Sequence, residues 1–136
     1  MNLGNFGMDT ITLGGSLESK LAASRAAGFT QIMLWARDLA TYPGGLEAAV
    51  ALVKNSGVRV TGIQVMRDYE GLDGALHEYK LDIARQMLLV ARAVGAPLLM
   101  VCSSTSKHAS GDMAHIARDL ARLANLAVPL GVRIGY

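Results

Sequence analysis

A short polar segment, Arg67-Asp68-Tyr69-Glu70, holds the densest set of chemically reactive side chains in this sequence. It directly follows an apolar run that ends at Met66. An arginine in such a place can hold a carboxylate or a phosphate through two parallel hydrogen bonds. We therefore predict that Arg67 and Asp68 contact a substrate. The alternative is a set of ion pairs that only orders the loop.

Three further polar residues lie at or after the ends of apolar runs, and we predict that they also contact a substrate. Gln64 lies near the end of the buried run and needs hydrogen-bond partners, in a pocket or in a barrel interior. Ser103 follows the next apolar run, and His108 lies in the polar loop beyond it. Cys102, which ends that run, is interpreted as a small buried hydrophobe rather than a nucleophile.

The three histidines do not have the spacing of a metal-binding motif such as His-x-x-x-His. His77 and His115 fall within predicted outer helices, and we expect both at the surface. We therefore predict no metal ligand among these residues and assign no catalytic residue.

Glycine marks four junctions at which a helix-like stretch ends and an apolar run begins, at Gly28, Gly57, Gly95 and Gly131. Glycine just past a helix end supplies the left-handed conformation that closes the helix. Each following run is too short for a helix and suits a buried strand. The alternation predicts βαβ units and a parallel sheet, whose carboxyl edge gathers the residues described above.

We predict five strands, one within Leu3–Leu13 and the others at Gln31–Trp35, Arg59–Met66, Pro97–Cys102 and Val132–Tyr136. Four amphipathic helices connect them. Their predicted apolar sides carry Leu46, Ala49, Val50 and Val53 in the second helix, and Leu76, Ile83, Met87, Val90 and Val94 beside Lys80 in the third. In the fourth they carry Met113, Ile116, Ala117, Leu120, Leu123, Ala124 and Ala127.

Two architectures fit five parallel strands and four helices. One is a flavodoxin-like doubly wound sheet, and the other is the first part of a (β/α)8 TIM barrel, which typically has about 250 residues. Leu13-Gly14-Gly15-Ser16 lacks the spacing of a phosphate-binding loop after the first strand. No helix follows the last predicted strand. We therefore expect residues 1–136 to form a single domain that is the N-terminal part of an α/β TIM barrel.

Composition narrows the class of protein. Hydrophobic residues make up 51% and charged residues 18% of 136 residues, which is typical of a globular domain. The net charge of +2 is interspersed without a Lys/Arg cluster, which disfavours a nucleic-acid partner. No apolar stretch reaches the roughly 18 residues that span a bilayer. One cysteine and a start without a basic signal region predict a cytoplasmic protein.

Several stretches resemble the sugar phosphate isomerase/epimerase superfamily, the xylose-isomerase-like TIM barrels, and most of all its bacterial 3-dehydroshikimate dehydratases. They follow the superfamily's order along the chain and comprise Thr10–Leu21, Ala26–Phe29, Gln64–Gly71, Met100–Ser103 and Gly131–Tyr136. The segment from Arg67 to Gly71 and the pair Cys102-Ser103 are the more specific parts. Endonuclease IV-like relatives are disfavoured because their zinc-binding histidines are replaced at both of these places.

The resemblance implies a divalent metal, Mg²⁺ or Mn²⁺, beside a side chain that moves a proton. It also implies a small substrate such as a polyol, a keto acid or a sugar phosphate. In the family the metal ligands come from strands five to eight, beginning with a glutamate directly after the Gly-Tyr that Tyr136 completes here. We therefore expect the full-length parent to bind the metal and residues 1–136 alone not to bind it. Met33 stands where many relatives carry a glutamate.

Two other readings stay open on the sequence. One is a non-catalytic binding module that keeps a half-barrel pocket for an anion. The other is a self-associating half-barrel, a homo-oligomer whose open sheet edges pair between chains.

Overall fold

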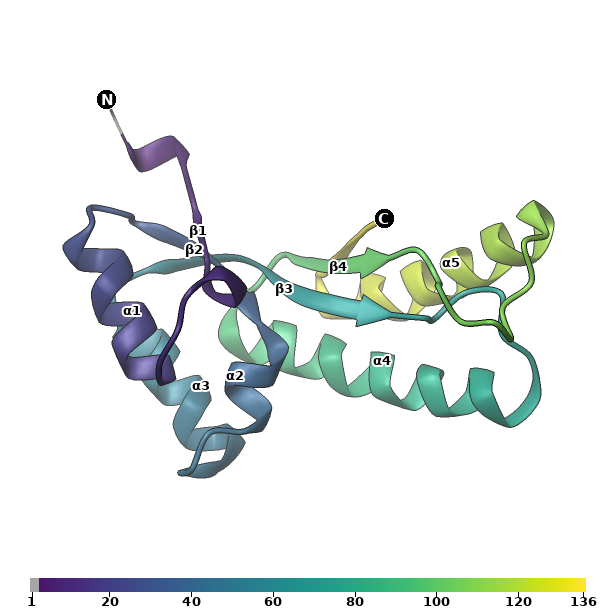
Figure 1. The fold of residues 1–136 in the computed structure, drawn as a ribbon, viewed down its shortest axis with the longest axis horizontal. Coiled ribbons are helices and arrows are strands. Elements are labelled where there is room, and N and C mark those ends of the chain that lie inside the picture. Colours follow the sequence, from purple (N-terminus) through teal and green to yellow (C-terminus); the bar gives the residue numbers. More distant parts are fainter. Residues whose placement is uncertain (1–2) are drawn as a thin grey trace.

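Helices cover one face of a five-stranded sheet in the computed structural model, which describes residues 3–136 (Figure 1). The strands are β1 (Met8–Asp9), β2 (Gln31–Trp35), β3 (Arg59–Arg67), β4 (Leu98–Cys102) and β5 (Arg133–Gly135). The helices are α1 (Leu17–Ala26), α2 (Ala36–Ala40), α3 (Gly45–Asn55), α4 (Gly74–Val94) and α5 (Met113–Ala127). Short 3₁₀ turns lie at Leu3–Asn5, Thr10–Thr12 and Val128–Leu130.

The strand order decides between the two predicted architectures. The order is β1-β2-β3-β4-β5, and every neighbouring pair is parallel. A flavodoxin-like sheet would have the order 2-1-3-4-5 instead. Consecutive parallel strands with helical crossovers are the arrangement of a (β/α)8 barrel, so the prediction of a partial TIM barrel is confirmed. β1 and β5 form the two edges of the sheet.

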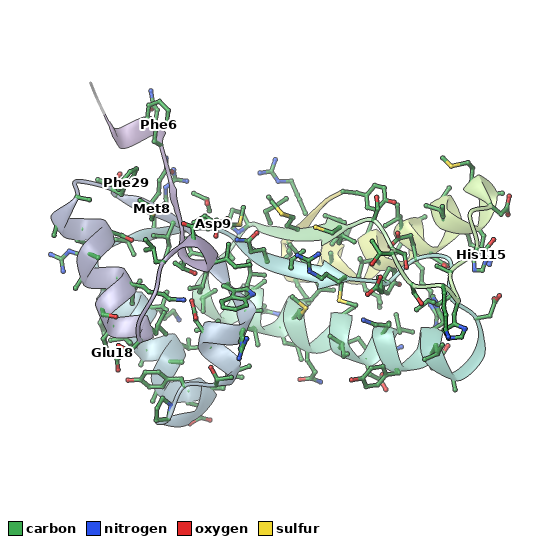
Figure 2. All side chains as sticks on the ribbon, viewed as in Figure 1. Phe6, Met8, Asp9, Glu18, Phe29 and His115 are labelled. Carbon is green, nitrogen blue, oxygen red and sulfur yellow. The ribbon has the colours of Figure 1, made fainter. Side chains whose placement is uncertain are left out.

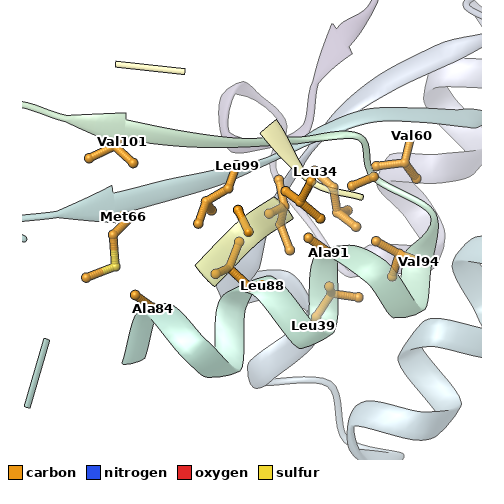
Figure 3. Close-up of a cluster of buried hydrophobic side chains, with 14 of the residues drawn as sticks. Leu34, Leu39, Val60, Met66, Ala84, Leu88, Ala91, Val94, Leu99 and Val101 are labelled. Carbon is orange, nitrogen blue, oxygen red and sulfur yellow. The ribbon is translucent and has the colours of Figure 1, made fainter. Parts of the chain in front are cut away.

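The hydrophobic core lies between the sheet and α4 (Figure 3). Leu34 of β2 and Leu99 of β4 are fully buried and pack with Leu88 and Ala91 of α4. Met66 of β3 is buried on the same face. Successive side chains of a strand point to opposite faces of the sheet. The residues next to these in the sequence therefore face the inside of the barrel.

Helix α4 buries a different face from the one predicted. Its buried residues are His77, Leu81, Ala84, Leu88, Ala91 and Val94. Of the predicted stripe, Leu76 is 47% exposed, and Ile83 and Met87 are only partly buried. The helix carries apolar residues on two adjacent faces, and the face with the small Ala84 and Ala91 lies against the sheet. The second apolar face is therefore left partly uncovered.

The structure has a fifth helix that the sequence analysis did not predict. Helix α2 begins directly after β2, and Leu39 anchors it in the core with 1% of its surface exposed. Its five residues follow the strand without a side-chain capping hydrogen bond, although alanine and leucine favour helix. None of the helices in residues 3–136 is long and apolar enough to span a membrane.

Candidate functional site

The carboxyl ends of the strands carry two loops that lie against each other. The β3–α4 loop (residues 68–73) and the β4–α5 loop (residues 103–112) are joined by a 2.6 Å hydrogen bond from the Ser110 N–H to the Gly71 carbonyl. Most of the residues with predicted substrate contacts lie in or beside these loops. Chemically active residues of parallel α/β barrels lie at this edge of the sheet.

Arg67 ends β3 with an exposed side chain. Its neighbour Met66 is buried toward the helices, so the alternation of the strand places Arg67 on the inner face. Lys80 Nζ donates to the Arg67 carbonyl at 2.8 Å and holds the backbone there. Within residues 3–136, no hydrogen bond or ion pair engages the Arg67 guanidinium. That group is therefore available to an anionic ligand.

Asp68 is engaged in holding the β4–α5 loop. Its Oδ1 atom accepts the Thr105 N–H at 2.7 Å and the Ser106 N–H at 3.1 Å, with the Ser104 hydroxyl at 3.4 Å. The hydrogen bond from the Thr105 backbone lowers the pKa of the Asp68 carboxyl, helped by the charge of Lys80. The carboxylate therefore spans the two loops as a stable anion.

Glu70 is a site residue that the sequence analysis did not assign. It is 2% exposed, and its Oε1 atom accepts the Ser104 N–H and the Tyr136 hydroxyl, the latter at 3.3 Å. The Tyr136 hydroxyl in turn accepts the Ser103 hydroxyl at 3.0 Å. The Glu70 network, formed by Glu70, Ser103, Ser104 and Tyr136, thus links the ends of β3, β4 and β5. Glu70 Oε2 is buried without a hydrogen-bond partner among the described residues.

Gln64 connects β3 with β1 across the inner face. Its Nε2 atom donates to Asp9 Oδ1, although β2 lies between the two strands in the sheet. Figure 2 shows Asp9 where β1 meets the sheet. Asp9 also caps the following 3₁₀ turn by accepting the Ile11 N–H at 3.0 Å. No pattern in the sequence singles out Asp9, because the first strand is predicted only within the eleven residues Leu3–Leu13.

His108 is exposed in the β4–α5 loop. Its backbone N–H donates to the Ser106 hydroxyl at 3.2 Å. Among the described residues, no contact joins its imidazole to Arg67, Gln64 or the Glu70 network. The structure therefore brings Ser103 into a polar cluster and leaves His108 apart from it.

His77 and His115 do not both lie at the surface as expected. His77 is 7% exposed, and its Nε2 atom lies 3.2 Å from Arg122 Nη1. His115, in the first turn of α5 (Figure 2), lies 3.3 Å from Asp119 Oδ2. Asp119 is buried and also accepts the Gly71 N–H at 2.9 Å. The buried Asp119 carboxylate on α5 thus holds the β3–α4 loop through Gly71. The predicted apolar stripe of α5 does not include this residue.

Tyr69 points away from the ligand edge into the core. Its side chain is fully buried, and its ring lies 5.7 Å from that of His77. Burial raises the pKa of Tyr69 to about 12, so the phenol stays protonated at physiological pH. Its hydroxyl has no partner among the described residues. Tyr69 therefore anchors the loop by burial, while its neighbours Asp68 and Glu70 make the polar contacts.

The described residues do not form a metal centre by themselves. No group of three or more His, Cys, Asp or Glu side chains within residues 3–136 is arranged to hold a metal ion. Of the carboxylates in these loops and behind them, Asp68, Asp112 and Asp119 already accept backbone N–H groups. Glu70 has a single unpartnered oxygen.

Residues 21–136 match the family model described as xylose isomerase-like TIM barrel. The chain belongs to this family. Two curated relatives are both named 3-dehydroshikimate dehydratase. The one from Pseudomonas aeruginosa is 34% identical and the one from Pseudomonas putida 33% identical, each over 127 residues. Each match covers 93% of this chain but 20% of the relative, so the chain spans about a fifth of their length.

Solved structures share the fold. A xylose isomerase-like TIM barrel/4-hydroxyphenylpyruvate dioxygenase fusion protein superposes with a TM-score of 0.86 at 32% identity, over 96% of this chain and 21% of that protein. The probable 3-DHS dehydratase AsbF from Bacillus anthracis superposes with a TM-score of 0.74 at 14% identity, over 95% of this chain and 50% of that protein. Coverage of half of each solved chain or less agrees with a partial TIM barrel.

Proposed function

We propose that this chain is the N-terminal part of a divalent-metal-dependent lyase of the 3-dehydroshikimate dehydratase type. The likeness to the two Pseudomonas proteins, which extends over 93% of the chain, carries the choice of a dehydratase over an isomerase or epimerase. The free guanidinium of Arg67 supports it, because 3-dehydroshikimate carries a carboxylate. The proposal places the protein in the cytoplasm and requires neither a nucleic acid nor a membrane.

In the proposed complex, the substrate lies on the inner face at the carboxyl edge of the sheet. Arg67 binds the carboxylate in bidentate fashion and orients the ring. The Oε1 atom of Gln64, which has no partner among the described residues, accepts a substrate hydroxyl. Ser103, which directly follows the neighbouring strand β4, contributes its hydroxyl to the substrate. Asp68 keeps the two loops together while the ligand enters.

The proposed reaction removes one water from the substrate. A base takes a proton from the carbon next to the ketone, the neighbouring C–O bond breaks, and a C=C bond forms as hydroxide leaves with a proton. None of residues 3–136 is assigned as that base. The proposal includes Mg²⁺ or Mn²⁺ in the intact protein, but no step is derived through the metal because the residues described here do not fit a metal centre.

The test uses the polypeptide that the intact gene encodes. It is incubated with 3-dehydroshikimate and Mn²⁺, and mass spectrometry follows the loss of one water. We expect turnover that stops after treatment with EDTA and returns with added Mn²⁺. Epimerisation of a ketose such as D-allulose, without conversion of 3-dehydroshikimate, would overturn the dehydratase and support an epimerase.

A further inference from the structure

A groove runs between α2 and α4 on the helix side of the sheet, outside the barrel interior. It consists of two adjoining hollows of about 330 and 490 Å³. Both hollows are lined by Ala36, Ile83 and Met87, so they lie side by side, and we name the pair the α2–α4 groove. Figure 1 shows α2 and α4 on the same side of the sheet. Ligand pockets in proteins have volumes of roughly 300–1,000 Å³.

The larger hollow is mainly apolar. Its walls include Leu39 and Ile63 from the core, and Ile83, Met87 and Val90 from the second apolar face of α4. This is the face that the packing of α4 against the sheet leaves partly uncovered. Because these apolar side chains stay open to water, an apolar ligand that covers them lowers the free energy of the complex.

The smaller hollow is cationic. Arg37 and Lys80 line it together with Trp35 and residues 65–67 of β3, and no acidic side chain does. The Arg37 guanidinium lies 5.3 Å from the centre of the Trp35 ring and forms no ion pair within residues 3–136. Lys80 donates to a backbone carbonyl, which leaves its charge without a carboxylate in direct contact.

The acidic residues near the groove are neutralised or engaged elsewhere. Asp82 lines the larger hollow but forms an ion pair with Arg85 at 2.7 Å. The charge of Lys80 lowers the pKa of Asp68, but the Asp68 carboxylate accepts N–H groups from the β4–α5 loop. The groove therefore has an excess of positive charge at the end nearest the strand tips and an apolar wall beyond it.

We propose that the α2–α4 groove binds a small amphiphilic anion, with a carboxylate between Arg37 and Lys80 and an apolar body along Ile83 and Met87. A charge at one end and an apolar wall along the rest select a ligand with the same division. The groove lies on the helix side of the sheet, whereas the proposed substrate lies on the inner face. The inference therefore goes beyond the proposed dehydratase and does not depend on it.

Calorimetric titration of the polypeptide from the intact gene tests the proposal with octanoate and with octanamide, which has the same chain but no charge. We expect octanoate to bind at one site at least about tenfold more tightly than octanamide, which corresponds to about 1.4 kcal/mol. Arg37→Gln, alone and with Lys80→Gln, should weaken octanoate and leave octanamide unchanged. Arg92→Gln is the matched control, because Arg92 is exposed on α4, the helix that carries Lys80. It should change the affinity for neither octanoate nor octanamide.

A second measurement, by NMR, detects binding in the protein without substitutions in the groove. In protein labelled with ¹³C at the methionine methyl groups, octanoate should shift the Met87 resonance, assigned with Met87→Leu. It should not shift that of Met113, which is 73% exposed on α5. Equal affinity for octanoate and octanamide, an unmoved Met87 resonance, or no binding would each overturn the proposal.

Discussion

Gly71→Ala should disrupt the candidate site more than a substitution at any other loop glycine near it. Gly71 has φ +76°, and an added Cβ atom would lie 2.6 Å from the Ser110 carbonyl oxygen and 3.2 Å from the Ser110 nitrogen. Both atoms are backbone, so neither can move like a flexible side chain. The two loops must therefore separate, and the hydrogen bonds of Gly71 with Ser110 and Asp119 are lost.

Gly74→Ala is the matched control. Gly74 also has a left-handed conformation, with φ +58°, but an added Cβ would meet nothing within 4 Å. The control therefore suffers only the backbone strain of a left-handed alanine, about 1–2 kcal/mol. Gly71→Ala suffers the same strain and loses two hydrogen bonds, each with a net contribution of about 1 kcal/mol. We expect about 3–4 kcal/mol for Gly71→Ala, about 2 kcal/mol more than for the control.

Hydrogen exchange followed by NMR measures this difference where it arises. The Ser110 amide, bonded to Gly71, and the Ser104 amide, bonded to Glu70, report on the loops. A difference of about 2 kcal/mol predicts protection of both amides about 30-fold lower in Gly71→Ala than in Gly74→Ala. Equal protection in the two variants would refute the argument that contact with Ser110 fixes the β3–α4 loop.

Four further predictions test single groups. Arg67→Ala should lower kcat/KM of the intact protein by about 30- to 1,000-fold, or 2–4 kcal/mol, with an unchanged melting temperature. A lower melting temperature at full activity would make Arg67 structural. Tyr69→Phe should leave stability equal or raise it by up to about 1 kcal/mol, because it removes a buried hydroxyl without a partner; chemical denaturation showing a clear loss would contradict this. The folded-state pKa of Asp68 is lowered, so its contribution to stability is present above the unfolded value of about 3.9 and is lost as pH falls further. Asp68→Asn should therefore flatten the acid limb of the unfolding curve below about pH 4, and an unchanged limb would argue against this role. Isolated residues 1–136 should self-associate in light scattering through the edges at β1 and β5, whereas a monodisperse monomer would count against open edges.

The sequence predicted the strands well because their signal is local. The glycine after each main helix and the apolar run after that glycine place β2, β3 and β4 within one residue of their observed bounds. Which face of α4 is buried was not predictable, because the helix carries two apolar stripes and only the close approach of Ala84 and Ala91 to the sheet decides between them. α2 has only five residues and no side-chain capping hydrogen bond, so no local pattern indicates it.

The candidate site was predictable in position but only partly in detail. Arg67 follows from its residue type at a strand end. The contacts of Asp68 and Glu70 depend on where a loop more than thirty residues later passes, as the pairs with Thr105 and Ser104 show. Asp119 is farther still in the sequence and lies among apolar helix positions. Long-range partners of this kind leave no periodic pattern in one sequence.

A crystal structure of the polypeptide from the intact gene with 3-dehydroshikimate tests the central claim most directly. We expect the ligand to lie on the inner face at the carboxyl edge, with both carboxylate oxygens within hydrogen-bond distance of the Arg67 guanidinium. Gln64 and Ser103 should contact its hydroxyl groups. A ligand held elsewhere, with the Arg67 guanidinium facing solvent, would contradict the proposed role of Arg67.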